Sequence, residues 1–157
     1  RVGPMNLGGP RRVRAPGVPF EALPRIHCVL LSHNHYDHLD RPTLRRLARA
    51  FDPMIITGLR NGSALRRSGA RHVIELDWWD NTQLANFSIT AVPVQHWSKR
   101  SPFSKNRTLW AGWVIEIPNF RFFFAGDSGY CPHFKQIGEK FGKIDLGPEK
   151  EDRDDEE

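Results

Sequence analysis

A short apolar run leads directly into a cluster of metal-binding side chains. Residues 26–32 (IHCVLLS) predict a buried strand, and the sequence HNHYDHLD follows at once. Side chains alternate along a strand, so the two histidines of an H-x-H pair point to the same side, and the turn after them brings the next polar residues to a second point nearby. Imidazole and carboxylate groups arranged in this way predict a site for two metal ions, with zinc favoured over iron or manganese. The motif supplies four candidate ligands: His33, His35, Asp37 and His38.

Two further candidate ligands follow other predicted strands. His96, in VPVQHW, is the natural third imidazole for the first metal ion. Asp127, in FFFAGDSGY, comes directly after a very apolar strand, and the flanking Gly126 and Gly129 allow the backbone to turn sharply there. A carboxylate in that place can bridge two cations. Taken alone, His96 is typical of polar surface and Asp127 of a turn cap; the HNHYDH motif makes both of them candidate ligands.

The hydrophobic pattern predicts strands that alternate with helices early in the chain and form hairpins later. Asp40 is expected to cap a helix over residues 42–51, and Gly142 to end one over residues 132–141. A turn and helix are expected around residues 61–68. The other predicted strands cover residues 54–57, 72–76, 87–94, 109–117 and 121–125, with a hairpin turn at Pro118 and Asn119. This order predicts an α/β or α+β fold with at least one mixed sheet.

The length of 157 residues fits one domain with its own core. We expect an irregular, basic, Gly- and Pro-rich lead-in over residues 1–24, the domain over residues 25–147, and an acidic disordered tail over residues 148–157. The net charge is +5, but residues 149–157 carry seven acids and two bases, so residues 1–148 carry a net +10. A body this basic favours an anionic partner such as a nucleic acid, an acidic membrane surface or a phosphate-bearing substrate.

The chain has only two cysteines, far apart, and no apolar run of eighteen residues. These features argue against a disulfide scaffold, a cysteine zinc site and a transmembrane helix. We expect a cytoplasmic protein, with peripheral contact to a membrane as the alternative. Trp78 and Trp79, in a predicted loop, are candidates for such a contact, although core packing is the commoner role of tryptophan.

The segments HNHYDH, QHW and AGDSGY, in this order, resemble the metallo-β-lactamase fold superfamily and, within it, the N-acylphosphatidylethanolamine-hydrolysing phospholipase D branch. The similarity extends over about residues 10–146. It implies an αββα sandwich with two zinc ions at one edge of its two sheets. His33, His35 and His96 would bind one zinc ion, Asp37 and His38 the other, and Asp127 would bridge both.

The resemblance also implies the chemistry. A zinc-held hydroxide would attack the phosphodiester of an N-acylated phospholipid, with Asp37 and Asp127 as the catalytic carboxylates and Tyr36 beside the substrate entrance. Alternatives with the same fold are a sugar-lactone hydrolase and a nuclease. Nucleic acid is the less favoured partner, because Arg45, Arg46 and Arg49 have the spacing of a solvated helix face.

The sequence departs from the superfamily in two ways. The superfamily supplies one more histidine to the second metal ion, well after the bridging aspartate, whereas the only later histidine here is His133. The first strands of the first sheet also lack a counterpart. We therefore expect a partial version of the fold, and the remaining alternative is an inactive chain that binds one metal ion or none.

Overall fold

The computed structural model describes residues 13–148, and the first half of this part is a parallel β-sheet. Its order is β1-β2-β3, formed by β1 (Cys28–Leu31), β2 (Met54–Gly58) and β3 (His72–Leu76). The helix α1 (Arg41–Phe51) connects the first two strands, and α2 (Gly62–Arg66) connects the second to the third. Strands buried on both faces need continuous apolar runs, and this requirement explains sequences such as CVLL and MIIT.

The second half is an antiparallel sheet in the order β4-β5-β6-β7. It comprises β4 (Asn81–Leu84), β5 (Phe87–Val92), β6 (Gly112–Ile117) and β7 (Phe120–Phe124), and α3 (His133–Phe141) follows it. The hairpin between β6 and β7 and the end of α3 at Gly142 confirm the predictions. The strand β4 was not predicted, because its sequence NTQL has no apolar run and its strand conformation comes from pairing with β5.

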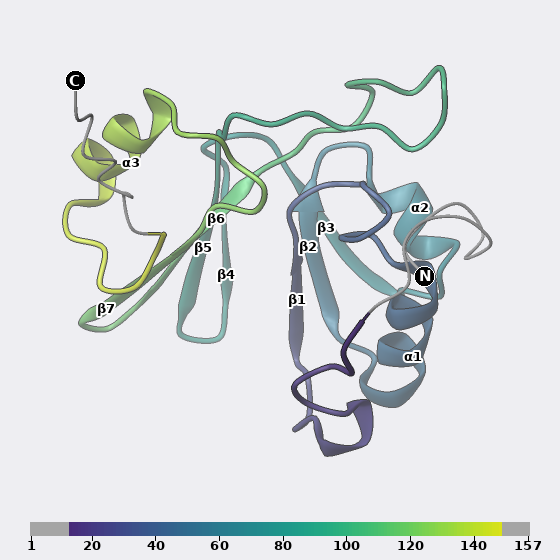
Figure 1. The fold of residues 1–157 in the computed structure, drawn as a ribbon. Helices are drawn as coiled ribbons and strands as arrows, with labels where there is room; N and C mark the ends of the chain where they lie inside the picture. The colour runs from purple at the N-terminus through teal and green to yellow at the C-terminus, as the bar shows by residue number, and fades with distance from the viewer. Residues whose placement is uncertain (1–12, 149–157) are drawn as a thin grey trace.

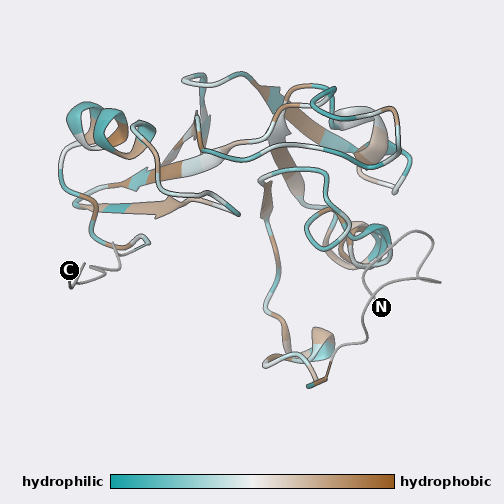
Figure 2. Cartoon of the chain, turned by 45° about the horizontal axis from the view of Figure 1, so that its top comes forward, coloured by the Kyte–Doolittle hydropathy of each residue, from teal (hydrophilic) through white to brown (hydrophobic). Residues whose placement is uncertain are grey.

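The two sheets stack between helices, which makes four layers (Figure 1). One apolar cluster lies between the sheets and centres on Ile56, Ala91 and Trp113, none of which is exposed. A second cluster joins the parallel sheet to α1 and α2, and a third joins the antiparallel sheet to α3. Figure 2 shows hydrophobic residues along the strands and hydrophilic ones over much of the helices. The predicted αββα architecture is confirmed.

Two strand predictions are corrected by the structure. The prediction of a mixed sheet is wrong for the described residues: parallel and antiparallel pairings are both present, but each sheet contains only one kind. The predicted strand over residues 109–117 begins only at Gly112, because the residues before it contact the other sheet: the amide of Leu109 donates to Leu59 and that of Ala111 to Ser32. These two hydrogen bonds, 2.8 and 2.9 Å long, join the sheets at one edge.

The helix α1 begins as predicted. The Asp40 carboxylate accepts hydrogen bonds from the amide and the hydroxyl of Thr43, at 3.0 and 2.6 Å, and Pro42 lies in the first turn. This cap satisfies an amide that has no partner within the helix. Because the helix starts directly after Asp40, the metal-binding motif occupies the whole connection between β1 and α1.

The predicted terminal segments are described only in part. Residues 13–24 are irregular apart from the 3-10 helix η2 (Phe20–Ala22), and the predicted acidic tail lies outside the described residues except for Pro148. Trp78 and Trp79 are partly buried against the intersheet cluster and the α3 cluster respectively, so core packing accounts for both. No helix within residues 13–148 has the length and apolar character that crossing a bilayer requires.

Trp113 is the largest fully buried side chain between the sheets. We expect Trp113→Ala to lower the free energy of unfolding by about 3–5 kcal/mol, because the substitution leaves a cavity that neither sheet can fill. Urea titration followed by circular dichroism measures the loss. Phe120→Ala on β7 is the matched control, with an expected loss of about 1 kcal/mol because that ring is 39% exposed. Equal losses would contradict the central role of Trp113.

Candidate metal centre

The loops that follow β1, β5 and β7 meet at one edge of the two sheets. The end of β5 and the end of β7 both pair with the start of β6, through Val92 with Gly112 and Phe124 with Trp113. Beyond the strands, a bridge between Gln95 and Gly129 keeps the two loops together. The carboxyl ends of the strands therefore bring together side chains that are more than ninety residues apart in the chain, from His33 to Asp127.

Three imidazole rings form the first group of donors. The Nε2 atom of His33 lies 2.9 Å from Nδ1 of His35 and 3.1 Å from Nε2 of His96, and the last two nitrogens are 3.2 Å apart. Ligands of a tetrahedral zinc ion, with Zn–N distances of about 2.0–2.1 Å, have nitrogens about 3.3 Å apart. Three nitrogens at this spacing fit a single cation. Asp127 completes the group, because one of its carboxylate oxygens and the histidine nitrogens all lie within 4.8 Å of one another.

Asp127 is shared between two groups of donors. Its Oδ1 atom lies 2.9 Å from Nε2 of His38, while Oδ2 lies 3.7 Å from Nε2 of His33 and 4.0 Å from that of His96. Asp37 completes the second group, with its Oδ2 atom 3.8 Å from Nε2 of His38. The two oxygens of one carboxylate thus face different groups, which is the arrangement that a bridging ligand needs.

The structure brings together all six residues that the sequence analysis named as ligands. His133 joins neither group: its ring lies 3.1 Å from the side-chain oxygen of Gln136 on its own helix. The first group has four donors and the second has three among the described residues, and Asp127 belongs to both. The donor chemistry fits a divalent cation at each group, with fewer protein ligands at the second.

Burial keeps the first group of histidines neutral. His33 is 1% exposed, and burial, reinforced by the neighbouring rings of His38, His96 and His35, lowers its pKa to about 3. Burial also lowers the pKa of His35 and of His96, although the carboxylates of Asp37 and Asp127 act in the opposite direction on both. Neutral imidazole is the form that binds a metal ion, so no proton has to leave these rings before binding.

Ser32 orients two of the histidines, and the sequence analysis did not identify it. Its hydroxyl lies 3.0 Å from Nδ1 of His33 and 3.2 Å from Nδ1 of His38, which leaves the Nε2 atoms of both rings facing the cluster. An outer partner of this kind selects the ring nitrogen that binds a metal ion. The only sequence signal was its position directly before the motif.

The turn at Gly126 places Asp127 close to Ser32. Gly126 has a φ of +62°, and a Cβ atom at this position would lie 3.0 Å from the Cβ of Ser32. Both the left-handed backbone and the close approach favour glycine, as the sequence analysis expected. The carboxylate that follows lies directly beside the end of β1.

Tyr36 lies at the rim of the cluster and is held there by the loop between β5 and β6. Its hydroxyl donates a 2.7 Å hydrogen bond to the carbonyl of Arg100, whose guanidinium lies 4.3 Å from the centre of the tyrosine ring. Arg100 also donates to the carbonyl of Asn34, at 2.9 Å. Trp97, 42% exposed, packs edge-on against the ring of His35. The sequence marks Trp97 only as one of five tryptophans that could contact lipid, and it gives no signal for Arg100, whose role depends on contacts with the distant Tyr36 and Asn34.

Comparison with known proteins agrees with this architecture. The sequence profile of the beta-lactamase superfamily domain matches residues 4–147. The chain belongs to this family. The predicted superfamily is thereby confirmed, and the match includes all six residues of the two donor groups.

Similar proteins support the predicted branch. The chain is 34% identical over 152 residues to N-acyl-phosphatidylethanolamine-hydrolyzing phospholipase D 1 of Caenorhabditis elegans, covering 90% of this chain and 43% of that protein. It is 39% identical over 148 residues to an uncharacterized protein of Mycobacterium tuberculosis, covering 93% of this chain and 40% of the other. The chain therefore spans less than half the length of these relatives.

Solved structures share the fold of this beta-lactamase superfamily domain. CmlA, a diiron beta-hydroxylase from Streptomyces venezuelae, matches with a TM-score of 0.66 at 24% identity, over 82% of this chain and 26% of that one. An isothiocyanate hydrolase from Delia radicum gut bacteria matches with a TM-score of 0.62 at 19% identity, over 85% and 56%. At this identity the likeness concerns the fold alone.

The lowered histidine pKa values predict how stability depends on pH in the metal-free protein. The buried rings stay neutral in the folded state, whereas in the unfolded chain they bind protons near pH 6.5. The unfolded state therefore binds more protons, and the free energy of unfolding falls as the pH decreases below about 6.5. Each such ring contributes at most about 1.4 kcal/mol per pH unit.

Urea titrations at pH 7.5, 6.5 and 5.5 with a chelator present test this dependence. The double variant His35→Gln/His96→Gln is expected to show a shallower decrease, because it lacks two of the three rings whose pKa burial lowers. A wild-type stability that stays constant across this range would contradict the buried, neutral cluster.

Proposed function

We propose that this domain is a metal-dependent hydrolase whose substrate is a phosphodiester, most specifically that of an N-acylated phospholipid. The observation that carries the proposal is the shared position of Asp127 between two donor groups, with one carboxylate oxygen toward each. The similarity to N-acyl-phosphatidylethanolamine-hydrolyzing phospholipases D of Caenorhabditis elegans and Saccharomyces cerevisiae supports the substrate class.

Zinc is the cofactor that we propose, with two ions per site. Three neutral imidazoles with one carboxylate suit zinc, and the nitrogen spacing of 2.9–3.2 Å is close to that of its tetrahedral ligands. The diiron protein that shares this fold supports iron as the main alternative. His33, His35 and His96 would hold one ion, Asp37 and His38 the other, and Asp127 both.

When bound, a pair of such cations lowers the pKa of a water molecule and polarises the phosphoryl group. The protein then has to fix the ligands and move one proton. Ser32 keeps the Nε2 atoms of two histidines directed at the cluster. Asp37 is 56% exposed beside His38, where its carboxylate can accept the proton that the attacking water loses.

The overall reaction needs no side-chain nucleophile. The oxygen of water forms a bond to phosphorus, the phosphorus–oxygen bond to the N-acylethanolamine breaks, and the departing oxygen takes up a proton. The products are phosphatidic acid and the N-acylethanolamine. We assign Asp37 and Asp127 as the catalytic residues of this reaction.

The rim formed by Tyr36, Trp97 and Arg100 is the proposed entrance for the substrate. The tyrosine hydroxyl is engaged with the Arg100 carbonyl and the Arg100 guanidinium lies over the tyrosine ring, so the exposed Trp97 is the surface open to an acyl chain. Phe103, in the same loop, is 85% exposed, and Lys99, Lys105 and Arg107 surround it in the sequence. Exposed aromatic and basic residues favour a membrane interface, so we propose that the domain works peripherally on an anionic membrane facing the cytoplasm.

The alternative of an inactive chain that binds a single metal ion draws support from the second donor group, which has only three donors among the described residues. Such a chain would bind one metal ion tightly, at the first group, and have little activity. The lactonase and nuclease alternatives have no observation of their own at the cluster, and assays separate them from the proposed activity.

Metal content decides between a dinuclear and a mononuclear site. After extensive dialysis, elemental analysis is expected to give about two zinc ions per chain. Asp127→Ala is expected to reduce this number because it removes a ligand from both groups. His133→Ala is the control and should leave the metal content unchanged, since that ring joins neither group. One ion or none in the wild type would overturn the dinuclear proposal.

Asp127→Ala is also expected to decrease hydrolysis of a generic phosphodiester by on the order of a hundredfold or more. The measurement compares kcat/KM for bis(p-nitrophenyl) phosphate, an N-acylphosphatidylethanolamine dispersion, a sugar lactone and single-stranded DNA. Wild-type activity restricted to the lactone or to DNA would replace the proposed substrate, and near-normal turnover by Asp127→Ala would remove this residue from the catalytic machinery.

A further inference from the structure

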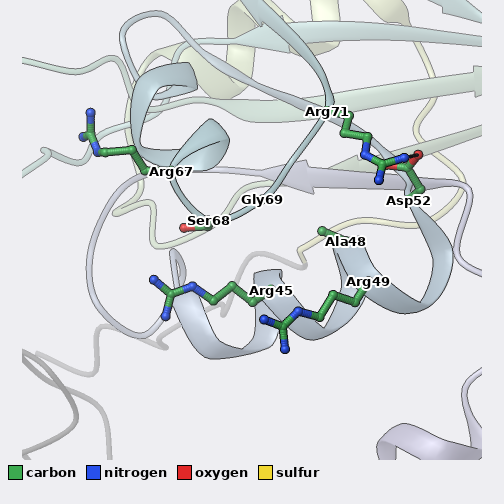
Figure 3. Close-up of a pocket in the computed structure, with 8 residues that line it drawn as sticks. All are labelled: Arg45, Ala48, Arg49, Asp52, Arg67, Ser68, Gly69 and Arg71. Atoms are coloured by element: carbon green, nitrogen blue, oxygen red, sulfur yellow. Dashed lines mark hydrogen bonds and ion pairs between the residues drawn. The ribbon is translucent and has the colours of Figure 1, made fainter.

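A basic groove lies on the outer face of the parallel sheet, between α1 and the segment that joins α2 to β3. Its volume is about 450 Å³. Arg45 and Arg49 come from α1, and Arg67 and Arg71 come from the opposite wall (Figure 3). The helical spacing of Arg45, Arg46 and Arg49 predicts a solvated face. Of those three arginines, only Arg46 does not line the groove, and its guanidinium pairs with Glu21 at 2.8 Å.

The positive charge of the groove is only partly compensated. Arg71 pairs with Asp52 at 3.4 Å, and Asp52 is the one acidic residue that lines the groove. Within residues 13–148, Arg45, Arg49 and Arg67 form no ion pair. Arg45 and Arg49 also lie four residues apart on one helix, a spacing at which like charges repel. Other arginines of the same region differ: Arg66, for example, lies 3.8 Å from Glu75.

The floor of the groove consists of small residues, which leaves room between the arginine walls. Ala48, Ser68 and Gly69 form this floor, and a Cβ atom at Gly69 would lie 3.9 Å from the Cβ of Ala48. The amides of Ser68 and Gly69 already donate to carbonyls of α2, and the Ser68 hydroxyl donates to Ala64. The guanidinium groups are therefore the donors that remain available to a ligand.

We propose that this groove binds a phosphate monoester through Arg45, Arg49 and Arg67. A guanidinium group presents paired N–H donors that match two phosphate oxygens, so it recognises phosphate more specifically than a point charge does. Figure 3 shows Arg45 and Arg67 on opposite walls near one end of the groove, while Arg71 and Asp52 occupy the other end. A phosphate at the first end neutralises the repulsion between the free arginines.

The size and the charge pattern favour a small phosphate over a nucleic acid. The volume is within the range of small-molecule sites, about 300–1,000 Å³. At the far end the Asp52 carboxylate would repel the next phosphate of a continuous nucleic-acid strand. The phosphate monoester can come from a soluble metabolite or from a lipid headgroup such as phosphatidic acid, and both present the same dianionic group.

The groove is separate from the metal centre. The six metal-centre residues lie beyond the carboxyl ends of the strands, whereas the groove is lined by residues of α1 and of the segments that follow α1 and α2, and the two sets share no residue. The inference does not depend on the proposed hydrolase activity, and its test measures binding rather than turnover.

The test is a calorimetric titration of the protein with glycerol 3-phosphate, a soluble phosphate monoester. The variant Arg45→Gln/Arg67→Gln is expected to bind at least tenfold more weakly than the wild type. The matched control is Arg66→Gln/Lys135→Gln, which loses the same net charge from two exposed positions outside the groove and should bind within twofold of the wild type. Binding of the probe at the metal centre is common to all variants, so the difference between variants reports on the groove.

Vesicles distinguish the two sources of phosphate. Binding to vesicles of phosphatidylcholine with phosphatidic acid, lost in Arg45→Gln/Arg67→Gln and absent with phosphatidylcholine alone, assigns the groove to a lipid headgroup. Binding of glycerol 3-phosphate without vesicle binding assigns it to a soluble ligand. The single variant Arg49→Gln, expected to weaken binding at least threefold, serves if the double variant does not fold.

Three outcomes would overturn the proposal. One is the absence of binding to either probe, and another is equal weakening in the groove variant and the charge-matched control. The third is binding of a single-stranded oligonucleotide that alone depends on Arg45 and Arg67, which would assign the groove to nucleic acid instead.

Discussion

The hydrogen bond from the amide of Ala111 to the carbonyl of Ser32 holds the two sheets together at the edge where the metal centre lies. It fixes the end of β1 against the segment that leads into β6. The hydrogen bond from the amide of Leu109 to the carbonyl of Leu59 and the close contact of Gly126 with Ser32 lie at the same junction between the sheets. The intersheet core around Trp113 lies directly below, so packing and backbone pairing set the same distance between the sheets. The positions of all three ligand-bearing loops depend on this distance.

This junction between the two sheets also explains why the histidine pKa values at the site are lowered. His33 follows Ser32 into the junction and is almost fully buried, so burial lowers its pKa and keeps the ring neutral. Asp37 and Asp127, by contrast, are 56% and 43% exposed. The site thus combines a buried set of neutral nitrogen donors with carboxylates that face solvent. The exposed carboxylates remain accessible to substrate and water.

The fold serves several reactions, since a hydroxylase and an isothiocyanate hydrolase share it. Chemistry on such a scaffold is decided by loops at the strand ends. Here the loop between β5 and β6 carries Trp97 and Arg100 to the rim, and Arg100 contacts both Tyr36 and Asn34 of the motif. The helical layer formed by α1 and α2 carries a separate group of charged side chains, the arginines of the groove. Four arginines of this layer line that groove, which includes none of the metal-centre residues.

The sequence by itself determined the local parts of this protein. The apolar run that forms β1 and the Asp40 cap are each encoded within a few residues, and the structure has both. His33 and His35 are close together, as predicted, but both lie beyond the end of β1, so the loop after the strand brings them together and not the alternation within it. The ligand set was predicted from motifs and resemblance together. Only the tertiary structure decided the features that depend on contacts between distant segments. Strand β4 has no apolar signal and exists through pairing with β5. Ser32 orients two rings because the chain turns back on it, and His133 lies outside the cluster because α3 directs it toward Gln136. Arg45 and Arg67 face one groove because α1 and α2 cover the same face of the parallel sheet, a relation that no periodicity in either segment contains.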